Sequence, residues 1–89
     1  MTGTRALRLK RLRMRAWHRG TKEMDLILGG FVDRHAETLA DGELDALEAL
    51  MEEPDQDLYR WVSGAEAVPA RHRPMVERIA RDFGLSPDH

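Results

Sequence analysis

Glycine and proline residues divide this sequence into segments that have room only for short helices. Gly20 ends the first segment, Pro54 and Gly64 enclose a short central one, and Pro74 and Gly84 enclose the last. Proline removes a backbone donor from a helix, and glycine accepts the left-handed conformation with which many helices end. Between these residues the apolar side chains recur with the 3.6-residue period of an amphipathic helix, and no segment alternates as a strand does. The sequence therefore predicts an all-α protein, a compact bundle of about five short helices.

The expected helices span residues 5–18, 21–36, 42–53 and 56–63, and a last one runs from near Pro74 to Phe83. Asp41 and Asp55 are the predicted N-caps of the third and fourth helices, because a short side-chain oxygen accepts a hydrogen bond from the first turn of a helix. Gly29 and Gly30 lie inside the second helix, where each weakens it by about 1 kcal/mol relative to alanine. We interpret this pair as the site of a close helix–helix crossing.

A chain of 89 residues has room for one hydrophobic core, so residues 1–89 are predicted to form a single domain. We expect an ordered core over about residues 5–83 and a frayed tail over residues 84–89. No apolar run approaches the roughly 18 residues that span a bilayer, so no membrane insertion is expected.

Charge is distributed unevenly along the chain, although the net charge is only −2. Residues 1–22 carry eight basic residues and no acid, whereas residues 23–89 carry all 16 acids and six basic residues. A basic helix of this kind suits a nucleic acid, an acidic protein partner or a targeting peptide. We give targeting the least weight, because the basic segment lacks a continuous apolar stretch and leads directly into a structured motif. The predicted location is a bacterial-type cytoplasm.

The sequence offers no constellation of residues for catalysis. Cysteine is absent, which excludes disulfides, thiolate nucleophiles and cysteine-ligated metals. The histidines occur singly and without metal-ligand spacing, and neither serine lies in a nucleophile elbow. No glycine-rich phosphate-binding loop is present. These residues are His18, His35, His72 and His89, with Ser63 and Ser86. We predict that the protein is not an enzyme and that it has no metal site.

Nucleic-acid binding is the main alternative that the residues themselves suggest. Successive cations on an amphipathic first helix are able to contact phosphates, with binding that weakens as salt rises. Against it, the remaining helices are acidic, and no recognition helix rich in arginine and amide side chains follows a tight turn. The simplest alternative is a solvated basic face that the acidic part of the bundle neutralises. A small basic-helix nucleic-acid-binding protein and a general protein-interaction module with another target both remain open.

The segment from Arg19 to Asp25, RGTKEMD, differs from the rest of the sequence. Gly20 ends one helix, Thr21 caps the next, and Glu23 and Asp25 in its first turn interact favourably with the helix dipole. Turn chemistry therefore explains every residue of the segment except Arg19. The same turn presents charged groups at defined angles on two rigid helices, which suits the binding of a partner.

Arg19-Gly20-Thr21-Lys22-Glu23 is similar to the RGxxE motif of the SdhE family, which is called succinate dehydrogenase assembly factor 2 in mitochondria. The resemblance continues through Phe31 and His35 to a second block, an acidic helix at residues 43–48 that is followed by the run EPDQDLYRW. It covers roughly residues 5–83, in the family's order and total length.

The resemblance implies a five-helix bundle that binds the flavoprotein subunit of succinate dehydrogenase, or of fumarate reductase in some bacteria. It also implies that the chain promotes covalent attachment of FAD to a histidine of that subunit. The chain itself would bind no cofactor stably and would be a monomer when free. It would act by positioning the partner's domains, because the bond-forming chemistry is the flavin's own.

By the same resemblance, Arg19, Gly20 and Glu23 form the centre of the contact with the partner. Gly20 allows the turn and a close approach, and the two charged residues offer charge-assisted hydrogen bonds of opposite sign. Trp61 has the spacing of a core residue and is expected to be buried, whereas Tyr59 points elsewhere and is expected to be exposed. The basic first helix would speed the encounter with the partner. The other predicted contact residues are Arg15, Asp25, Asp57 and Tyr59.

Overall fold

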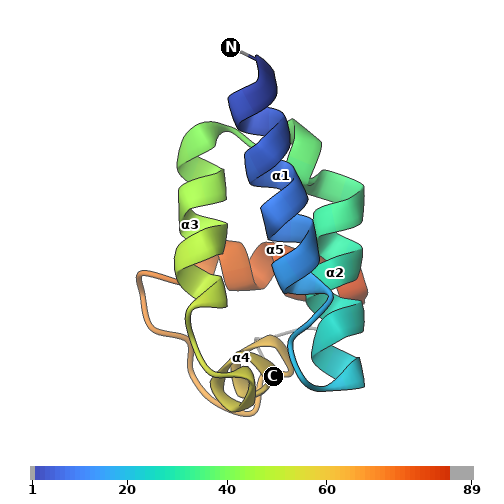
Figure 1. Ribbon diagram of the computed structural model, residues 1–89. Coiled ribbons are helices and arrows are strands. Elements are labelled where there is room, and N and C mark those ends of the chain that lie inside the picture. The colour runs from blue at the N-terminus through green and yellow to red at the C-terminus, as the bar shows by residue number, and fades with distance from the viewer. Residues whose placement is uncertain (1, 85–89) are drawn as a thin grey trace.

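The computed structural model describes residues 2–84 of the chain, and five α-helices and one short 3-10 helix make up its regular structure (Figure 1). No strand occurs in these residues, so the prediction of an all-α fold with five helices is confirmed. The elements are α1 (Thr2–Ala16), α2 (Lys22–His35), η1 (Ala36–Thr38), α3 (Asp41–Met51), α4 (Asp55–Val62) and α5 (Arg73–Phe83).

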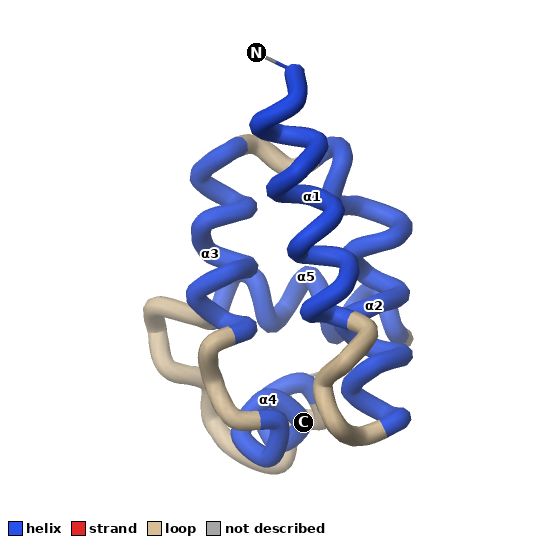
Figure 2. Tube along the Cα trace, in the orientation of Figure 1, coloured by secondary structure: helices blue, strands red, loops and turns tan. Residues whose placement is uncertain are grey.

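Helices α1, α2 and α3 run alongside one another along the length of the molecule (Figure 1). Helix α5 crosses behind them and contacts α2, α3 and α4, as the tube in Figure 2 also shows. The short helix α4 closes the lower end of the bundle, below the C-terminal end of α3 and beside the turn between α1 and α2. Among the described helices, none is long and apolar enough to cross a membrane.

Every α-helix contributes to one continuous core of buried apolar side chains. Its members lie at the positions that the helical periodicity predicts, because one face of each short helix has to be buried for the helix to be stable. Trp61 is only 6% exposed and Tyr59 is 47% exposed, so both predictions about this pair are confirmed. The core includes Leu12 and Ala16 of α1, Ile27 and Phe31 of α2, Leu44 and Leu47 of α3, Leu58 of α4, and Val76 and Ile79 of α5.

The close crossing predicted at the glycine pair of α2 is confirmed for Gly29. A Cβ atom on Gly29 would lie 2.3 Å from Cδ2 of Trp17, so the indole occupies the space that a side chain would need. The Trp17 Nε1–H group also donates to Asp33 Oδ2 at 3.1 Å, which orients the ring over α2. Gly30 instead faces the guanidinium of Arg34 from its own helix. Gly29 therefore allows the end of α1 to pack closely against α2, because it leaves room for the Trp17 ring.

Both predictions of an aspartate N-cap are wrong. The N-cap residues of α3 and α4 are Ala40 and Pro54. Each has an extended backbone and directly precedes the first residue of its helix. Asp41 is instead the first residue of α3 and forms an ion pair with Arg5 at 2.7 Å. Asp55 is the first residue of α4, and its carboxylate is occupied by Arg19, as described below. In both cases a cation from a distant part of the chain competes successfully with the local backbone for the carboxylate.

Several helix ends differ from the expected ones by one to three residues. The first helix ends at Ala16 rather than at His18, and α3 ends at Met51 rather than at Glu53. Gly84 ends α5 in the left-handed conformation, with φ of 86°. The tail expected over residues 84–89 lies, apart from Gly84, outside the described residues.

The acidic helices neutralise most of the cations of α1. The arginines of α1 that flank its buried face reach sideways to carboxylates of α3 on one side and of α2 on the other. The Arg8 guanidinium bonds to Glu48 and to Asp45, and these contacts raise its pKa above the usual value. For these arginines, the structure therefore agrees with the simplest alternative from the sequence, in which the acidic part of the bundle neutralises the basic face. The remaining pairs are Arg5–Asp41, Arg13–Asp33 and Arg15–Glu52.

Candidate functional site

The turn that joins α1 to α2 has part of the local chemistry that its sequence predicts. The prediction that Gly20 ends the first helix is wrong, because α1 already ends at Ala16 and Gly20 lies inside the connecting turn. Gly20 has φ of 113°, a conformation that residues with a side chain rarely adopt. Thr21 is the N-cap of α2, and its Oγ1 accepts a hydrogen bond from the Met24 amide at 3.2 Å. Asp25 Oδ1 accepts a second bond, from the Arg19 amide at 2.7 Å. Two hydrogen bonds therefore join the turn to the start of α2, one from the Met24 amide to the Thr21 side chain and one from the Arg19 amide to the Asp25 side chain.

Arg19 joins this turn to the loop between α3 and α4. Its Nε donates to Asp55 Oδ1 at 2.8 Å, Nη1 donates to the Met51 carbonyl at 2.7 Å, and Nη2 donates to the Glu53 carbonyl at 2.9 Å. The Arg19 side chain is 12% exposed and that of Asp55 is 18% exposed. A planar guanidinium with three engaged nitrogens holds its partners in one relative orientation. The residue that turn chemistry leaves unexplained thus connects two segments about 35 positions apart in the sequence.

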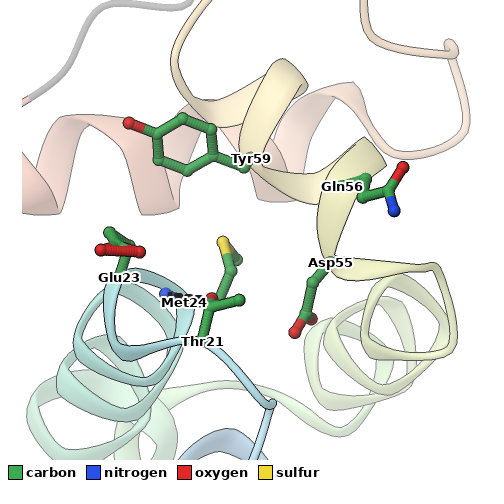
Figure 3. Close-up of a pocket in the computed structure, with 6 residues that line it drawn as sticks. All are labelled: Thr21, Glu23, Met24, Asp55, Gln56 and Tyr59. Carbon is green, nitrogen blue, oxygen red and sulfur yellow. Dashed lines mark hydrogen bonds between the residues drawn. The ribbon is translucent and has the colours of Figure 1, made fainter.

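Between the segments that Arg19 connects lies a groove of about 430 Å³ (Figure 3). One wall is the first turn of α2 and the other is the first two turns of α4. The groove is lined by Thr21, Glu23, Met24, Asp55, Gln56 and Tyr59.

Glu23 and Tyr59 project from the two opposite walls of this groove (Figure 3). Glu23 is exposed and forms no ion pair with the described residues, so its carboxylate is available to a partner. Tyr59 presents a half-exposed ring with a phenolic hydroxyl, which combines apolar contact area with a hydrogen-bonding group. Because Met24 at the floor is apolar and Asp55 is already neutralised by Arg19, the groove suits a partner surface that combines a cation with apolar side chains.

The structure assembles the seven predicted contact residues only in part. Glu23 and Tyr59 lie on opposite walls of the groove, and Arg19 is bonded to Asp55, which also lines it. Gly20 lies in the turn next to Arg19 and does not line the groove. Asp25 turns back to the Arg19 amide and is partly buried. Whether these residues contact a partner stays a prediction.

Two of the seven lie apart from the groove. Arg15 pairs with Glu52 at 2.6 Å and borders a separate shallow depression with Met14, His18 and Arg19. Asp57 lies 3.7 Å from Arg60 on α4 and does not line the groove.

Sequence reasoning missed the role of Asp55 and the group of residues that supports α4. Glu53 accepts a hydrogen bond from His72 Nε2–H at 2.8 Å and another from Arg71 at 3.1 Å, and these bonds lower the pKa of Glu53 below its usual value. His72 is 4% exposed, and its ring lies 5.6 Å from that of Trp61. No local pattern predicts these contacts, since the partners lie 18 or more positions apart.

His35, the other residue singled out by the resemblance, lies at the opposite end of α2 from the groove. Its ring packs against Phe31 with 5.1 Å between the centroids, and Nε2 is within hydrogen-bonding distance of Asp82 on α5. Arg34 bonds to the same carboxylate, and these contacts lower the pKa of Asp82. This end of α2 is therefore held to α5.

Within residues 2–84, no group of three or more histidine and carboxylate side chains is placed to bind a metal ion. The candidate site itself consists of the groove and the turn beside it. The fold and the site together define a small all-helical protein with an open groove between the first turns of two helices.

Comparison with known proteins identifies the family. The profile of the Sdh5 family, described as the flavinator of succinate dehydrogenase, matches residues 10–82. This chain belongs to that family of assembly factors, so the resemblance noted in its sequence is confirmed.

Individual relatives agree with this assignment. An FAD assembly factor SdhE of Acetobacter pasteurianus is 41% identical over 78 residues, which cover 86% of this chain and 72% of the relative. An FAD assembly factor SdhE of Aliivibrio fischeri is 35% identical over 72% of this chain and 76% of the relative. Succinate dehydrogenase assembly factor 2 of Mycosarcoma maydis, a mitochondrial protein, is 37% identical over 75% of this chain but only 28% of its own length. No solved structure matches this chain.

Proposed function

We propose that this protein is an FAD assembly factor that binds the flavoprotein subunit of succinate dehydrogenase and promotes covalent attachment of FAD to it. In a cell that contains fumarate reductase, the flavoprotein subunit of that enzyme is a second partner on which the protein acts in the same way. The protein acts in a bacterial-type cytoplasm, is a monomer when free and binds no cofactor stably. Family membership supports this function, and the geometry of the turn supports the surface that carries it out.

The observation that carries the proposal is the three-bond connection from Arg19 to the loop between α3 and α4. It holds the first turn of α2 and the first turn of α4 in a defined relation, so that Glu23 and Tyr59 present a preorganised surface to the partner. Preorganisation raises affinity because less conformational freedom is lost on binding. In this account Arg19 and Gly20 shape the surface, while Glu23 and Tyr59 contact the partner.

The action on the partner is one of positioning. A rigid protein that binds one arrangement of the partner's domains better than the others shifts their population towards that arrangement. When the favoured arrangement brings the flavin and the accepting histidine together, the effective concentration of the two reactants rises. The reacting groups both belong to the flavoprotein and its FAD.

Nucleic-acid binding has less support, because four arginines of α1 and Arg19 are paired within the chain. Lys10, Arg11 and Lys22 are the cations of residues 2–22 that form no ion pair with the described residues. Asp45 and Glu52 are exposed beside α1 and pair with Arg8 and Arg15, so these flanks of the helix offer a duplex little net positive charge.

The function is tested with apo flavoprotein subunit, FAD and this protein, by reading covalent flavin from its fluorescence in a denaturing gel. The variants are Glu23→Ala and Tyr59→Ala, both at exposed side chains, and Glu66→Ala at an exposed loop position serves as the matched control. We expect wild type and the control to accelerate flavin attachment, and each groove variant to reduce this acceleration at least tenfold while circular dichroism stays unchanged.

Two results would contradict the proposal in different ways. If wild type leaves the rate of flavin attachment unchanged, the protein does not act on this flavoprotein. If wild type accelerates attachment and both groove variants match the control, the protein acts through another surface.

A further inference from the structure

The outward side of α1 carries a strip of exposed residues that the core and the ion pairs do not use. The strip consists of Leu7, Lys10, Arg11, Met14 and His18. Leu7, Arg11 and Met14 follow at intervals of four and three residues, so they lie on one face of α1. His18 lies two residues beyond the end of α1 and is bonded to the Met14 carbonyl. Buried Leu12 and Ala16 lie on the opposite face. In Figure 1, α1 lies at the front of the bundle, and no other helix of the described residues lies in front of it.

The apolar members of the strip are well exposed. Leu7 is 48% exposed and Met14 is 58% exposed, the latter being the largest exposed fraction among the large apolar side chains of the described residues. Single exposed apolar residues are common on protein surfaces, but these two are seven residues, or about two helical turns, apart with Lys10 and Arg11 between them. An alternation of apolar and cationic side chains along one face is typical of a helix that binds an acidic, partly apolar surface.

The ion pairs of α1 distinguish this strip from the rest of the basic helix. The other arginines of α1 are bonded to carboxylates of α2 and α3, which neutralises the flanks of the helix. Lys10 and Arg11 form no ion pair with the described residues and extend from the outward face. The strip is therefore a narrow positive ridge between flanks that are already neutral or acidic.

This pattern selects among the possible partners. A duplex presents two broad rows of phosphates, and a strip whose lysine and arginine cations are Lys10 and Arg11 offers it few phosphate contacts. A narrow acidic segment that carries apolar side chains, such as one face of a helix, meets only the ridge. Met14 suits such a contact because its flexible thioether adapts to an irregular surface.

The strip also continues into the candidate site. The shallow depression beside its lower end is bordered by Met14, Arg15, His18 and Arg19, and Arg19 begins the turn that forms the groove. His18 Nδ1–H donates to the Met14 carbonyl at 2.7 Å and so holds the last part of the strip against the end of α1. From Leu7 to Met14 the ridge extends for about 10 Å, at 1.5 Å per residue.

We propose that this strip is a second docking surface, and that it binds an acidic, partly apolar segment of the same flavoprotein that the groove contacts. The inference rests on the proposed function, because it assigns the strip to that partner. The groove determines what the protein does to the flavoprotein, and the strip adds affinity and fixes the direction in which the bundle lies on it.

The test measures the affinity of the apo flavoprotein subunit for Arg11→Glu, Lys10→Glu and Met14→Ser, together with the yield of covalent flavin at saturating concentration. The matched control is Arg73→Glu, which makes the same change of charge at an exposed residue on α5, an element that lies behind α1 (Figure 1). All four positions are exposed, and circular dichroism checks that each variant folds.

We expect Arg11→Glu and Lys10→Glu each to weaken binding about fivefold to tenfold, and Met14→Ser to weaken it about threefold. The control should stay within twofold of wild type. The yield of covalent flavin at saturation should stay at the wild-type level for all of them, because the groove is intact.

Other outcomes would overturn the inference, and they show whether the strip alone or the proposed function as well has failed. If wild type binds the flavoprotein and the strip variants bind as well as the control, the strip is not a docking surface for this partner. If Arg11→Glu abolishes retardation of a labelled DNA duplex that wild type retards, and leaves flavoprotein binding unchanged, the strip belongs to a nucleic-acid site. If wild type fails to bind the flavoprotein at all, the proposed function fails, and this assignment of the strip fails with it.

Discussion

Arg19 and Asp55 lie 36 positions apart in the chain and form an ion pair with 2.8 Å between Nε and Oδ1. Both side chains are mostly buried, and the same guanidinium also donates to the carbonyls of Met51 and Glu53. The first turn of α2 and the first turn of α4 therefore depend on one another, although neither helix is long enough to be stable alone. The candidate site consists of these two turns and the groove between them.

Replacement of Arg19 is expected to destabilise the whole fold. Arg19→Ala leaves a mostly buried carboxylate and two carbonyls without their donor, which we expect to lower the free energy of unfolding by about 3 kcal/mol. Arg15→Ala, the control, removes an exposed ion pair with Glu52 and should cost about 0.5 kcal/mol or less. Urea denaturation followed by circular dichroism measures both. Equal stabilities of the two variants would mean that the Arg19 contacts contribute no more than an exposed ion pair.

A side chain at Gly29 is expected to separate α1 from α2. In Gly29→Ala the new Cβ would lie 2.3 Å from the Trp17 ring, so the indole or the helix has to move, at a cost of about 1–3 kcal/mol. Gly42→Ala makes the same change in α3 at a position where a Cβ meets no atom within 4 Å. That control should be neutral or slightly stabilising, because alanine favours the helix. Thermal unfolding compares the two variants, and a Gly29→Ala protein as stable as Gly42→Ala would contradict the close crossing.

Stability should fall in acid partly through Glu53. Hydrogen bonds from His72 and then from Arg71 lower the pKa of Glu53 below its ordinary value of 4.5, so the unfolded chain binds this proton more readily than the folded one. The stabilisation is complete above the ordinary pKa and is lost as the pH falls from about 5 through the lower pKa of the folded state. Urea denaturation at a series of pH values should show a shallower acid loss for Glu53→Gln than for wild type.

Glu66→Gln is the control for this comparison, since Glu66 is exposed and forms no ion pair with the described residues. Its acid loss should follow that of wild type. A Glu53→Gln profile that is parallel to the wild-type profile would assign the acid sensitivity to other carboxylates, such as Asp82 and Glu43, whose pKa values are also lowered by their hydrogen bonds.

Salt is expected to act on the rate of association with the flavoprotein more than on the rate of dissociation. The unpaired cations of the outward strip attract an acidic surface over a distance of about one Debye length, which shortens as salt rises. Stopped-flow measurements between low and physiological salt should show association slowing several-fold and dissociation changing less. Arg11→Glu should reduce this salt dependence and Arg73→Glu should not. A salt effect confined to dissociation would remove the steering role of α1.

The sequence predicts the parts of this molecule that depend on contacts within a few residues. The helical periods, the turn at Gly20, the cap at Thr21 and the opposite exposures of Trp61 and Tyr59 all follow from spacings of four residues or fewer. The two aspartate caps were wrong for the complementary reason, because each carboxylate binds an arginine more than 30 positions away. The indole that fills the space at Gly29 and the support of the groove by Arg19 are likewise long-range contacts, which a local pattern does not specify.

Arg19 binds the carbonyl of Met51, the last residue of α3, and that of Glu53, two residues beyond it, and this helix has no basic residue in its own last turn. The negative end of its dipole is therefore compensated by a cation that the chain supplies from a turn about 30 residues earlier. Helix α3 moved to another protein would lose this compensating cation. The RGTKE segment moved to another protein would likewise lose the carbonyls that Arg19 binds. A peptide or a grafted loop that carries only RGTKE should consequently lose the geometry of the groove, so any minimal mimic of the surface has to include the end of α3 and the start of α4.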